Sequence, residues 1–495
     1  MRTRKGSNSL SSWLAPLLPA SWIQSKSLHL KKREAASLVG YGTVVSIFCN
    51  AVGEASTLKQ LLLLWGCAEA AFYLYQKWRY TIVNEEWIEE IDVDRVQEVK
   101  ARFLELHGVL SIQDFITGWF HGAPYEHIHR GNVLDFVAYG FYSKRPQDLS
   151  PKTQASSERF VNEVEKRWGV KFPEGRNPDL KFMAHLWEPL RVFHKPLLVH
   201  MISETWGMGM HMYLRAIGFK HAIMGGMSYW VRLPTSGPLG SDSSPNLMHE
   251  SADESSQQEL SLTRPIVFLH GVGLGLTPYI HFMRMLFAAT SSHPMIVLEF
   301  RHVSMRLCFR ASEVDHAAHA VAAIVQQQGF KEACIVGHSF GTFVASRLCQ
   351  LHPSLVQSLL IIDPVCMLTC CPQLLHSFVY KVPVWGLNLL TPLGLMDLAR
   401  FVCSRDLIIA ETFCRKFCWH SLMLWPEDMP KATTISLSAN DDLVPNDLVV
   451  AQLEASPLPV KVIVHPTAGH GGYLLDQQFQ ENLIQEVKSL ASTRP

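Results

Sequence analysis

The sequence predicts an α/β fold built on a mostly parallel sheet, because short apolar runs alternate with helical patterns along its C-terminal half. The runs that we expect to form strands are residues 266–269, 296–300, 334–336, 359–362, 435–437 and 462–464. Strands that are apolar on both faces belong in a parallel sheet covered by helices on both sides. The helical patterns between and after them cover residues 313–328, 447–453 and 481–490.

The composition describes a globular protein with additional apolar material, since 48% of its 495 residues are hydrophobic and 18% are charged. Lys plus Arg and Asp plus Glu both number 44, which excludes the domain-wide basic excess of a nucleic-acid-binding protein. The 11 cysteines are odd in number and scattered, so we expect reduced thiols. The nearest metal-like pattern, Cys414, Cys418 and His420, has no second ligand pair, and we expect neither a metal nor a cofactor.

The N-terminal segment, residues 1–80, has the features of a membrane attachment. Residues 1–33 are basic and contain no acid, which is typical of the cytoplasmic flank of a membrane helix and also of an organelle transit peptide. An uncharged apolar stretch follows at 35–53, and a second one, at 58–78, carries Glu69 near its centre. We expect a hairpin over residues 35–78 with the remaining chain in the cytosol, or a pair of helices packed on the soluble protein.

The rest of the chain separates into a helical region, residues 81–218, and an α/β domain, residues 219–495. An apolar run at 196–219 includes His200, Glu204 and Arg215, so we expect a helix that is buried or lies on a membrane surface. Residues 228–234 read as a strand. Residues 235–262 are too polar to bury a core and predict a mobile surface loop.

A serine at a sharp turn is the main candidate for chemistry. The predicted strand 334–336 runs into Gly337-His-Ser339-Phe-Gly341, and an apolar helical face follows. Two flanking glycines allow strand and helix to pass closely while the serine hydroxyl is exposed. A serine needs a base, and the base needs an orienting acid. Asp441 and Asp442 follow one later strand and His470 follows the next.

The order Ser, Asp, His, together with His270-Gly-Val-Gly273 after the strand at 266–269, resembles the α/β-hydrolase superfamily, in particular serine hydrolases of the AB hydrolase-1 type. The resemblance covers residues 263–495. It implies an α/β-hydrolase fold in which Ser339 is the nucleophile, His470 the base and Asp441 the orienting acid. It also implies an oxyanion hole formed by the backbone N–H groups of Val272 and Phe340. Asp441 fits the D-x-x-V-P spacing of relatives, while Asp442 and Asp363 are alternative acids.

Residues 365–430, between two predicted strands, are rich in Leu, Phe, Trp, Cys and Met. An insertion here forms a helical lid in this superfamily, and its apolar composition favours a small-molecule or lipid acyl substrate. The leading hypothesis is a membrane-associated serine hydrolase that cleaves a carboxylic ester or thioester through an acyl-enzyme.

Two alternatives remain open at this stage. The first is acyl transfer on the same triad, although Leu475 occupies the acid position of the H-x4-D pattern of such relatives and Asp476 comes one residue late. The second is a non-catalytic binding protein with the same fold. The stretches 118–125 and 419–425 also loosely resemble membrane-anchored hydrolases of fungi and algae whose substrates are uncharacterised.

Overall fold

The computed structural model describes residues 57–85, 93–234, 264–384, 386 and 391–492. The chain divides into two units, Met1–Leu74 and Tyr75–Pro495, and the boundary lies inside helix α4 (Thr57–Val83). The predicted basic leader, the apolar segment 35–53 and the loop 235–262 lie outside the described residues. The domain limits at residues 80 and 218 stay predictions.

The second predicted membrane segment, residues 58–78, does form a helix, since α4 contains all of it. No helix among the described residues, however, is long and apolar enough to cross a membrane. Lys59, Glu69 and Lys77 interrupt the apolar sequence of α4, and charged side chains near the centre of a bilayer are costly. The first helix of the predicted hairpin lies outside the described residues, and the hairpin over residues 35–78 stays a prediction.

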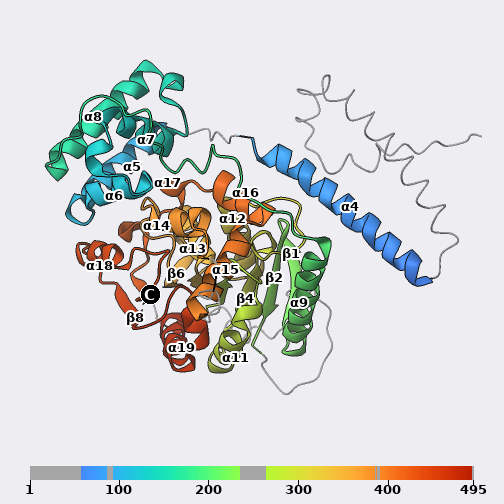
Figure 1. Cartoon of the computed structure of the whole chain (residues 1–495). Coiled ribbons are helices and arrows are strands. Elements are labelled where there is room, and N and C mark those ends of the chain that lie inside the picture. The colour runs from blue at the N-terminus through green and yellow to red at the C-terminus, as the bar shows by residue number, and fades with distance from the viewer. Residues whose placement is uncertain (1–56, 86–92, 235–263, 385, 387–390, 493–495) are drawn as a thin grey trace, which may run out of the picture. The chain divides into compact units, whose positions relative to one another are not determined.

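The helical region before the sheet consists of α5 (Val93–Leu104), α6 (Ile112–Trp119), α7 (Arg130–Tyr142) and α8 (Pro151–Trp168) (Figure 1). Local sequence fixes several of these helix ends. Ser150 accepts a hydrogen bond from the Thr153 N–H at the start of α8, and Gly169 ends that helix in a left-handed conformation with φ of 66°. The predicted α-helical N-terminal region is confirmed.

The sheet has eight strands in the order β1-β2-β4-β3-β5-β6-β7-β8. Their bounds are Lys220–Met224 (β1), Met227–Arg232 (β2), Ile266–Leu269 (β3), Met295–Glu299 (β4), Ala333–His338 (β5), Val356–Ile362 (β6), Ala432–Ser438 (β7) and Lys461–His465 (β8). From β4 to β8 all neighbours are parallel, whereas β2 pairs antiparallel with both β1 and β4. The mostly parallel sheet is as predicted.

Strand β1 was not expected from the sequence. It forms a hairpin with β2 through Gly225 and Gly226, whose φ values are 56° and 77°. Two successive residues with positive φ form the two-residue turn that matches the twist of a hairpin, and glycine adopts it without steric cost. The Gly-Gly pair is the sequence signal for this hairpin. The strand before it is hard to recognise, because it is short and begins with the polar Lys220 and His221.

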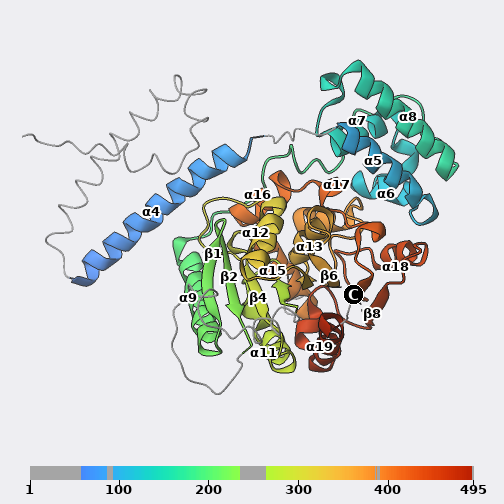
Figure 2. The same ribbon diagram turned by 180° about the vertical axis from the view of Figure 1, so that it is seen from behind.

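Helices cover both faces of the sheet, as the two-sided apolar strands predict. Val267 and Leu269 belong to a core with residues of α12 (Val314–Gln327) and α13 (Phe340–Leu351). Ile266 and Phe268, which point to the opposite face, belong to a second core with residues of α11 (Ile280–Ala289) and α19 (Gln477–Ser492). α11 and α19 contact each other on that face and lie side by side in both views (Figures 1 and 2).

The insertion between β6 and β7 is helical, as expected for a lid. It contains α14 (Gln373–Leu375), a π-helical turn (η7, His376–Tyr380), α15 (Pro392–Ser404), α16 (Leu407–Arg415) and α17 (Trp419–Leu422). Helix α18 (Asn446–Glu454) connects β7 to β8. Helix α9 (Leu197–Ala216) precedes β1 and packs against it at the antiparallel edge of the sheet.

Candidate active site

Ser339 occupies the sharp turn between β5 and α13. Its backbone has φ of 51° and ψ of −121°, a region that is strained for any residue with a Cβ. The tight packing needs glycine on the helix side, because a Cβ on Gly341 would lie 2.2 Å from the backbone oxygen of Leu269. Gly341 therefore has the steric role expected of it, and the Ser339 hydroxyl is presented at the end of the strand.

His470 lies between Ser339 and Asp441. Its Nε2 is 2.8 Å from Ser339 Oγ, and its Nδ1 is 2.7 Å from Asp441 Oδ2. Because a carboxylate oxygen accepts, Nδ1 carries the proton and Nε2 is free to accept one from the serine. Asp441 follows β7 and His470 follows β8, so the parallel strands bring the three predicted side chains together at one edge of the sheet.

The Asp441 carboxylate is held in place by the backbone that follows it. Its Oδ1 accepts hydrogen bonds from the N–H groups of Leu443 at 2.8 Å and Val444 at 3.2 Å. Burial acts to lower the pKa of His470, but the Asp441 carboxylate opposes this through its charge and hydrogen bond, and the pKa is raised above its ordinary value. The site thus favours the imidazolium that would form when His470 takes a proton.

The two alternative acids have other partners. Asp442 Oδ2 accepts from Arg400 at 2.7 Å and from Lys381 at 3.3 Å. Burial acts to raise the pKa of Asp442, but the Arg400 hydrogen bond and charge keep it below its ordinary value. Asp363 Oδ2 accepts from the backbone N–H of Gly471 at 2.6 Å. Of the three candidate acids, Asp441 is the one that contacts the imidazole of His470.

A buried polar chain beneath the serine was not predicted from the sequence. Tyr279 Oη lies 2.6 Å from His338 Nδ1 and accepts a hydrogen bond from the Gly271 N–H at 2.8 Å. His338 Nε2 in turn lies 3.6 Å from Asp363 Oδ2. Burial lowers the pKa of His338 despite the nearby Asp363 carboxylate, which favours a neutral ring. The chain joins the loop after β3, the serine turn and the loop that carries His470.

The loop after β3 holds the predicted oxyanion donor Val272. His270 Nδ1 donates to its neighbouring Gly271 carbonyl at 2.7 Å, and His270 Nε2 accepts from the Phe300 N–H at 2.8 Å. Burial lowers the pKa of His270 to about 4, so it stays neutral and can fill both roles. The second predicted donor, Phe340, is the first residue of α13, where a backbone N–H has no acceptor within the helix.

Ser339 and His470 open into a pocket of about 570 Å³ between the sheet and the lid. Val272 and Phe340 also line it, and most of the other lining side chains are apolar. The loop after β3 contributes Leu274 and Pro278, the loops after β4 and β7 contribute Met305 and Leu443, and the lid contributes Val365, Leu374, Phe378, Leu395, Met396, Leu398, Ala399, Val402, Cys403 and Phe413. Arg400 is the charged exception, and Asp442 neutralises it. The walls are thus suited to a hydrocarbon chain.

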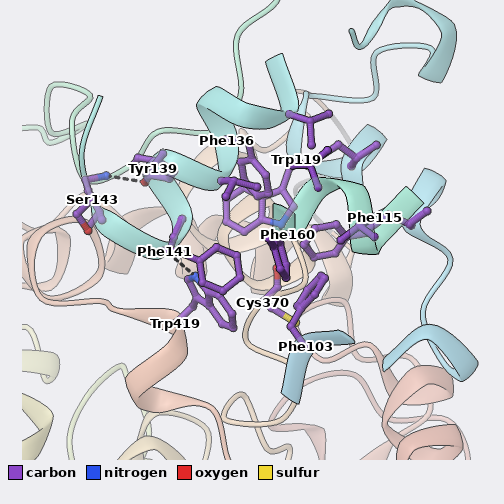
Figure 3. A pocket seen from close by; sticks show the side chains of 18 of the residues that line it. Phe103, Phe115, Trp119, Phe136, Tyr139, Phe141, Ser143, Phe160, Cys370 and Trp419 are labelled. Atoms are coloured by element: carbon purple, nitrogen blue, oxygen red, sulfur yellow. Dashed lines mark hydrogen bonds between the residues drawn. The ribbon is translucent and has the colours of Figure 1, made fainter. Parts of the chain in front are cut away.

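A second cavity, of about 50 Å³, lies in the helical region away from the serine (Figure 3). Aromatic side chains such as Phe103, Phe136 and Trp419 surround it, and Trp419 Nε1 donates to the Gly140 carbonyl at 2.7 Å. Its lining brings no nucleophile together with a base and an acid. We interpret it as a packing space where α5–α8 meet the lid residues Cys370 and Trp419.

The metal-like cysteine pattern does not assemble. Cys418 Sγ lies 2.9 Å from His420 Nε2, but Cys414 does not complete a set of three ligand atoms with them. Among the described residues, the one such set is Asp363, Asp441 and His470. Asp441 and His470 are hydrogen-bonded to each other, and Asp363 accepts from the backbone N–H of the neighbouring Gly471.

Comparison with the profiles of known protein families agrees with this architecture. The sequence profile of the Alpha/beta hydrolase family matches residues 266–481. No curated protein matches the sequence.

Similar solved structures include a bacterial membrane phospholipase A, with 13% identity over 60% of this chain and 94% of that one and a TM-score of 0.37. An α/β hydrolase from a Medee basin deep-sea metagenome has 13% identity over 56% of this chain and 98% of its own, with a TM-score of 0.37. The monoacylglycerol lipase of Paleococcus ferrophilus has 14% identity over 46% of this chain and 94% of its own, with a TM-score of 0.33. From the profile match, residues 266–481 belong to the Alpha/beta hydrolase family, and they contain the strand–serine–helix turn of Ser339.

Proposed function

We propose that the protein is a serine hydrolase that cleaves a carboxylic ester or thioester with a lipid-like acyl group through an acyl-enzyme. The observation that carries this proposal is the hydrogen-bonded line Ser339–His470–Asp441 at the floor of an apolar pocket. A nucleophile, an oriented base and a hydrocarbon-lined space are the three parts that this chemistry needs.

In the proposed reaction, Ser339 Oγ attacks the substrate carbonyl carbon while its proton passes to His470 Nε2. The negative charge on the carbonyl oxygen is stabilised by the N–H groups of Val272 and Phe340, and Asp441 stabilises the imidazolium. His470 then protonates the departing alcohol or thiol as the acyl–oxygen or acyl–sulfur bond breaks. A water molecule repeats the sequence on the acyl-enzyme, which releases the acid and restores the serine.

Membrane association is part of the proposal, as the apolar N-terminal sequence suggests. The described part of the first unit supports it, because Leu58, Leu61, Leu62 and Leu64 of α4 are each 60–67% exposed. Exposed apolar clusters of this kind mark a surface that meets another apolar surface. Fractionation of cells that express the tagged full chain, at neutral pH and physiological salt, tests this point, and recovery of the chain in the soluble fraction alone would contradict it.

The test of catalysis is labelling with a fluorophosphonate probe, combined with turnover of p-nitrophenyl esters of increasing acyl length. We expect wild type to be labelled and Ser339→Ala not to be, with Ser312→Ala as a matched control elsewhere in the chain. Each added CH2 that enters the pocket should raise kcat/KM by roughly fourfold, from about 0.8 kcal/mol per buried CH2. A folded wild-type protein that is neither labelled nor active would favour the binding-protein alternative.

Acyl transfer has less support, because the chain lacks the acid that relatives with this activity carry in the H-x4-D pattern after the histidine. Leu475 stands at that position and is 91% exposed, and the neighbouring Asp476 accepts from His465 Nε2 at 3.1 Å. Product analysis with an added long-chain alcohol separates the two reactions, since a hydrolase releases mainly free acid whereas a transferase forms the new ester.

A further inference from the structure

Helix α9 turns Glu204 and His211 toward the protein and exposes most of its apolar side chains to the solvent. Gly207, Met210 and Leu214 are buried against the sheet edge. The opposite side, which we call the α9 face, consists of Val199, Met201, Ile202, Trp206, Met208 and Met212, whose side chains are 41–67% exposed. A helix on the surface of a water-soluble protein normally has the reverse distribution, and an exposed apolar patch of this kind marks an interaction surface.

Ion pairs fix this orientation, so that the α9 face cannot rotate inward. Glu204 accepts from Arg301 at 2.7 Å and from Arg306 at 2.7 Å. About two turns later, His211 Nε2 lies 3.0 Å from the buried Glu299 carboxylate, which also pairs with Arg306. Burial acts to raise the pKa of Glu299, but His211 and Arg306 lower it to about 2, so this anchor keeps its charge.

The charge around the α9 face is complementary to an anionic surface. Glu204 is the one acid of α9, and it is turned toward Arg301 and Arg306. The charged residues that are exposed at the C-terminal end of the helix and just beyond it are Arg215 and Lys220. An apolar helix face with cations at its border is the pattern that binds the headgroup region of anionic lipid.

The position of α9 relative to the pocket also favours a lipid surface. The turn η5 (Thr277–Tyr279) contacts α9, and its Pro278 lines the pocket. Lys195, just before α9, lies 3.7 Å from the sulfur of Met305, another pocket residue. The pocket residues Leu274, Leu395 and Met396 are themselves 36–54% exposed. A bilayer on the α9 face would therefore lie beside the segments that form an apolar pocket.

We propose that the α9 face docks the protein on an anionic lipid surface. This inference rests on the membrane association proposed above and assigns it to one helix face. It does not depend on the catalytic assignment, so the two can fail separately.

The test is co-sedimentation of the full chain with vesicles of phosphatidylcholine and phosphatidylserine at about 4:1, compared with phosphatidylcholine alone. We expect Ile202→Glu with Trp206→Glu to weaken vesicle binding at least about tenfold, because charged side chains are costly in the apolar part of an interface. The matched control, Ala155→Glu with Gln478→Glu, adds the same charge at exposed positions elsewhere and should bind as wild type does. Ile202→Ser with Trp206→Ala gives a milder second variant if the glutamates impair folding.

Each outcome decides the inference. Loss of binding with unchanged hydrolysis of a soluble short-chain ester supports it. Equal binding of wild type and both α9 variants overturns it and leaves attachment to another segment. Absence of wild-type binding overturns it as well, while the soluble ester assay still reports on catalysis. A wild-type dimer that the α9 variants convert to monomers, without vesicle binding, would overturn it in favour of a second copy.

Discussion

Asp363 is joined to the loop of His470 by a direct hydrogen bond, in which Asp363 Oδ2 accepts from the backbone N–H of Gly471 at 2.6 Å. Asp363 itself is fully buried at the end of β6 and has φ of 46°. A buried carboxylate in a strained backbone conformation costs free energy. Its contacts with Gly471 and His338 indicate that it positions the base and the serine turn together.

We expect Asp363→Asn to lower kcat by roughly tenfold with little change in KM, far less than loss of a triad member. Asparagine tolerates the positive φ and can still accept from Gly471, but it lacks the negative charge that helps raise the pKa of His470. The acid limb of the kcat/KM profile should therefore move to lower pH. An unchanged profile in a folded variant would show that Asp363 has a structural role alone.

The two neighbouring acids after β7 should differ sharply in their effect on turnover. Asp441→Asn removes the carboxylate that fixes the His470 tautomer, and kcat should fall by about 10⁴-fold. Asp442→Asn removes pairs with Arg400 and Lys381 at a position that is 39% exposed, so its effect on stability should be within about 1 kcal/mol. Its kcat on a short-chain ester should stay near that of wild type. The opposite ranking would reassign the orienting acid to Asp442.

The pH dependence of acylation follows from the raised pKa of His470. The base must be neutral to take the Ser339 proton, so activity should rise with pH, with a midpoint above the ordinary histidine value of about 6.5. The rate of fluorophosphonate labelling against pH measures this midpoint without a substrate. Asp441→Asn should move it to lower pH, because the largest interaction that raises the pKa is then lost. A midpoint well below that of a free imidazole would contradict the arrangement.

The sequence predicts the features that depend on residues close together in the chain. These features are the turn between strand and helix at Ser339, the loops that carry Asp441 and His470, and the strands that are apolar on both faces. The partners of His338 could not be predicted, since Tyr279 and Asp363 come from different loops. The orientation of α9 depends in the same way on Arg301 and Arg306, about a hundred residues later, so its sequence alone could not place Glu204 inward or Trp206 outward.

Gly341 offers a test of the close approach between α13 and β3. A Cβ at this position would lie 2.2 Å from the Leu269 backbone oxygen, which cannot move without displacing the strand. We expect Gly341→Ala to lower the free energy of unfolding by at least about 1–3 kcal/mol and to reduce turnover by displacing Ser339. Gly209→Ala is the matched control, because Gly209 lies in α9 and a Cβ there meets nothing within 4 Å.

The control should raise stability by about 0.5–1 kcal/mol, since alanine is the better helix former. Thermal unfolding monitored by circular dichroism, together with ester turnover below the transition, measures both effects. If Gly341→Ala unfolded at the wild-type temperature and kept full activity, α13 would not pack on β3 as closely as described, and the serine would not depend on glycine for its position.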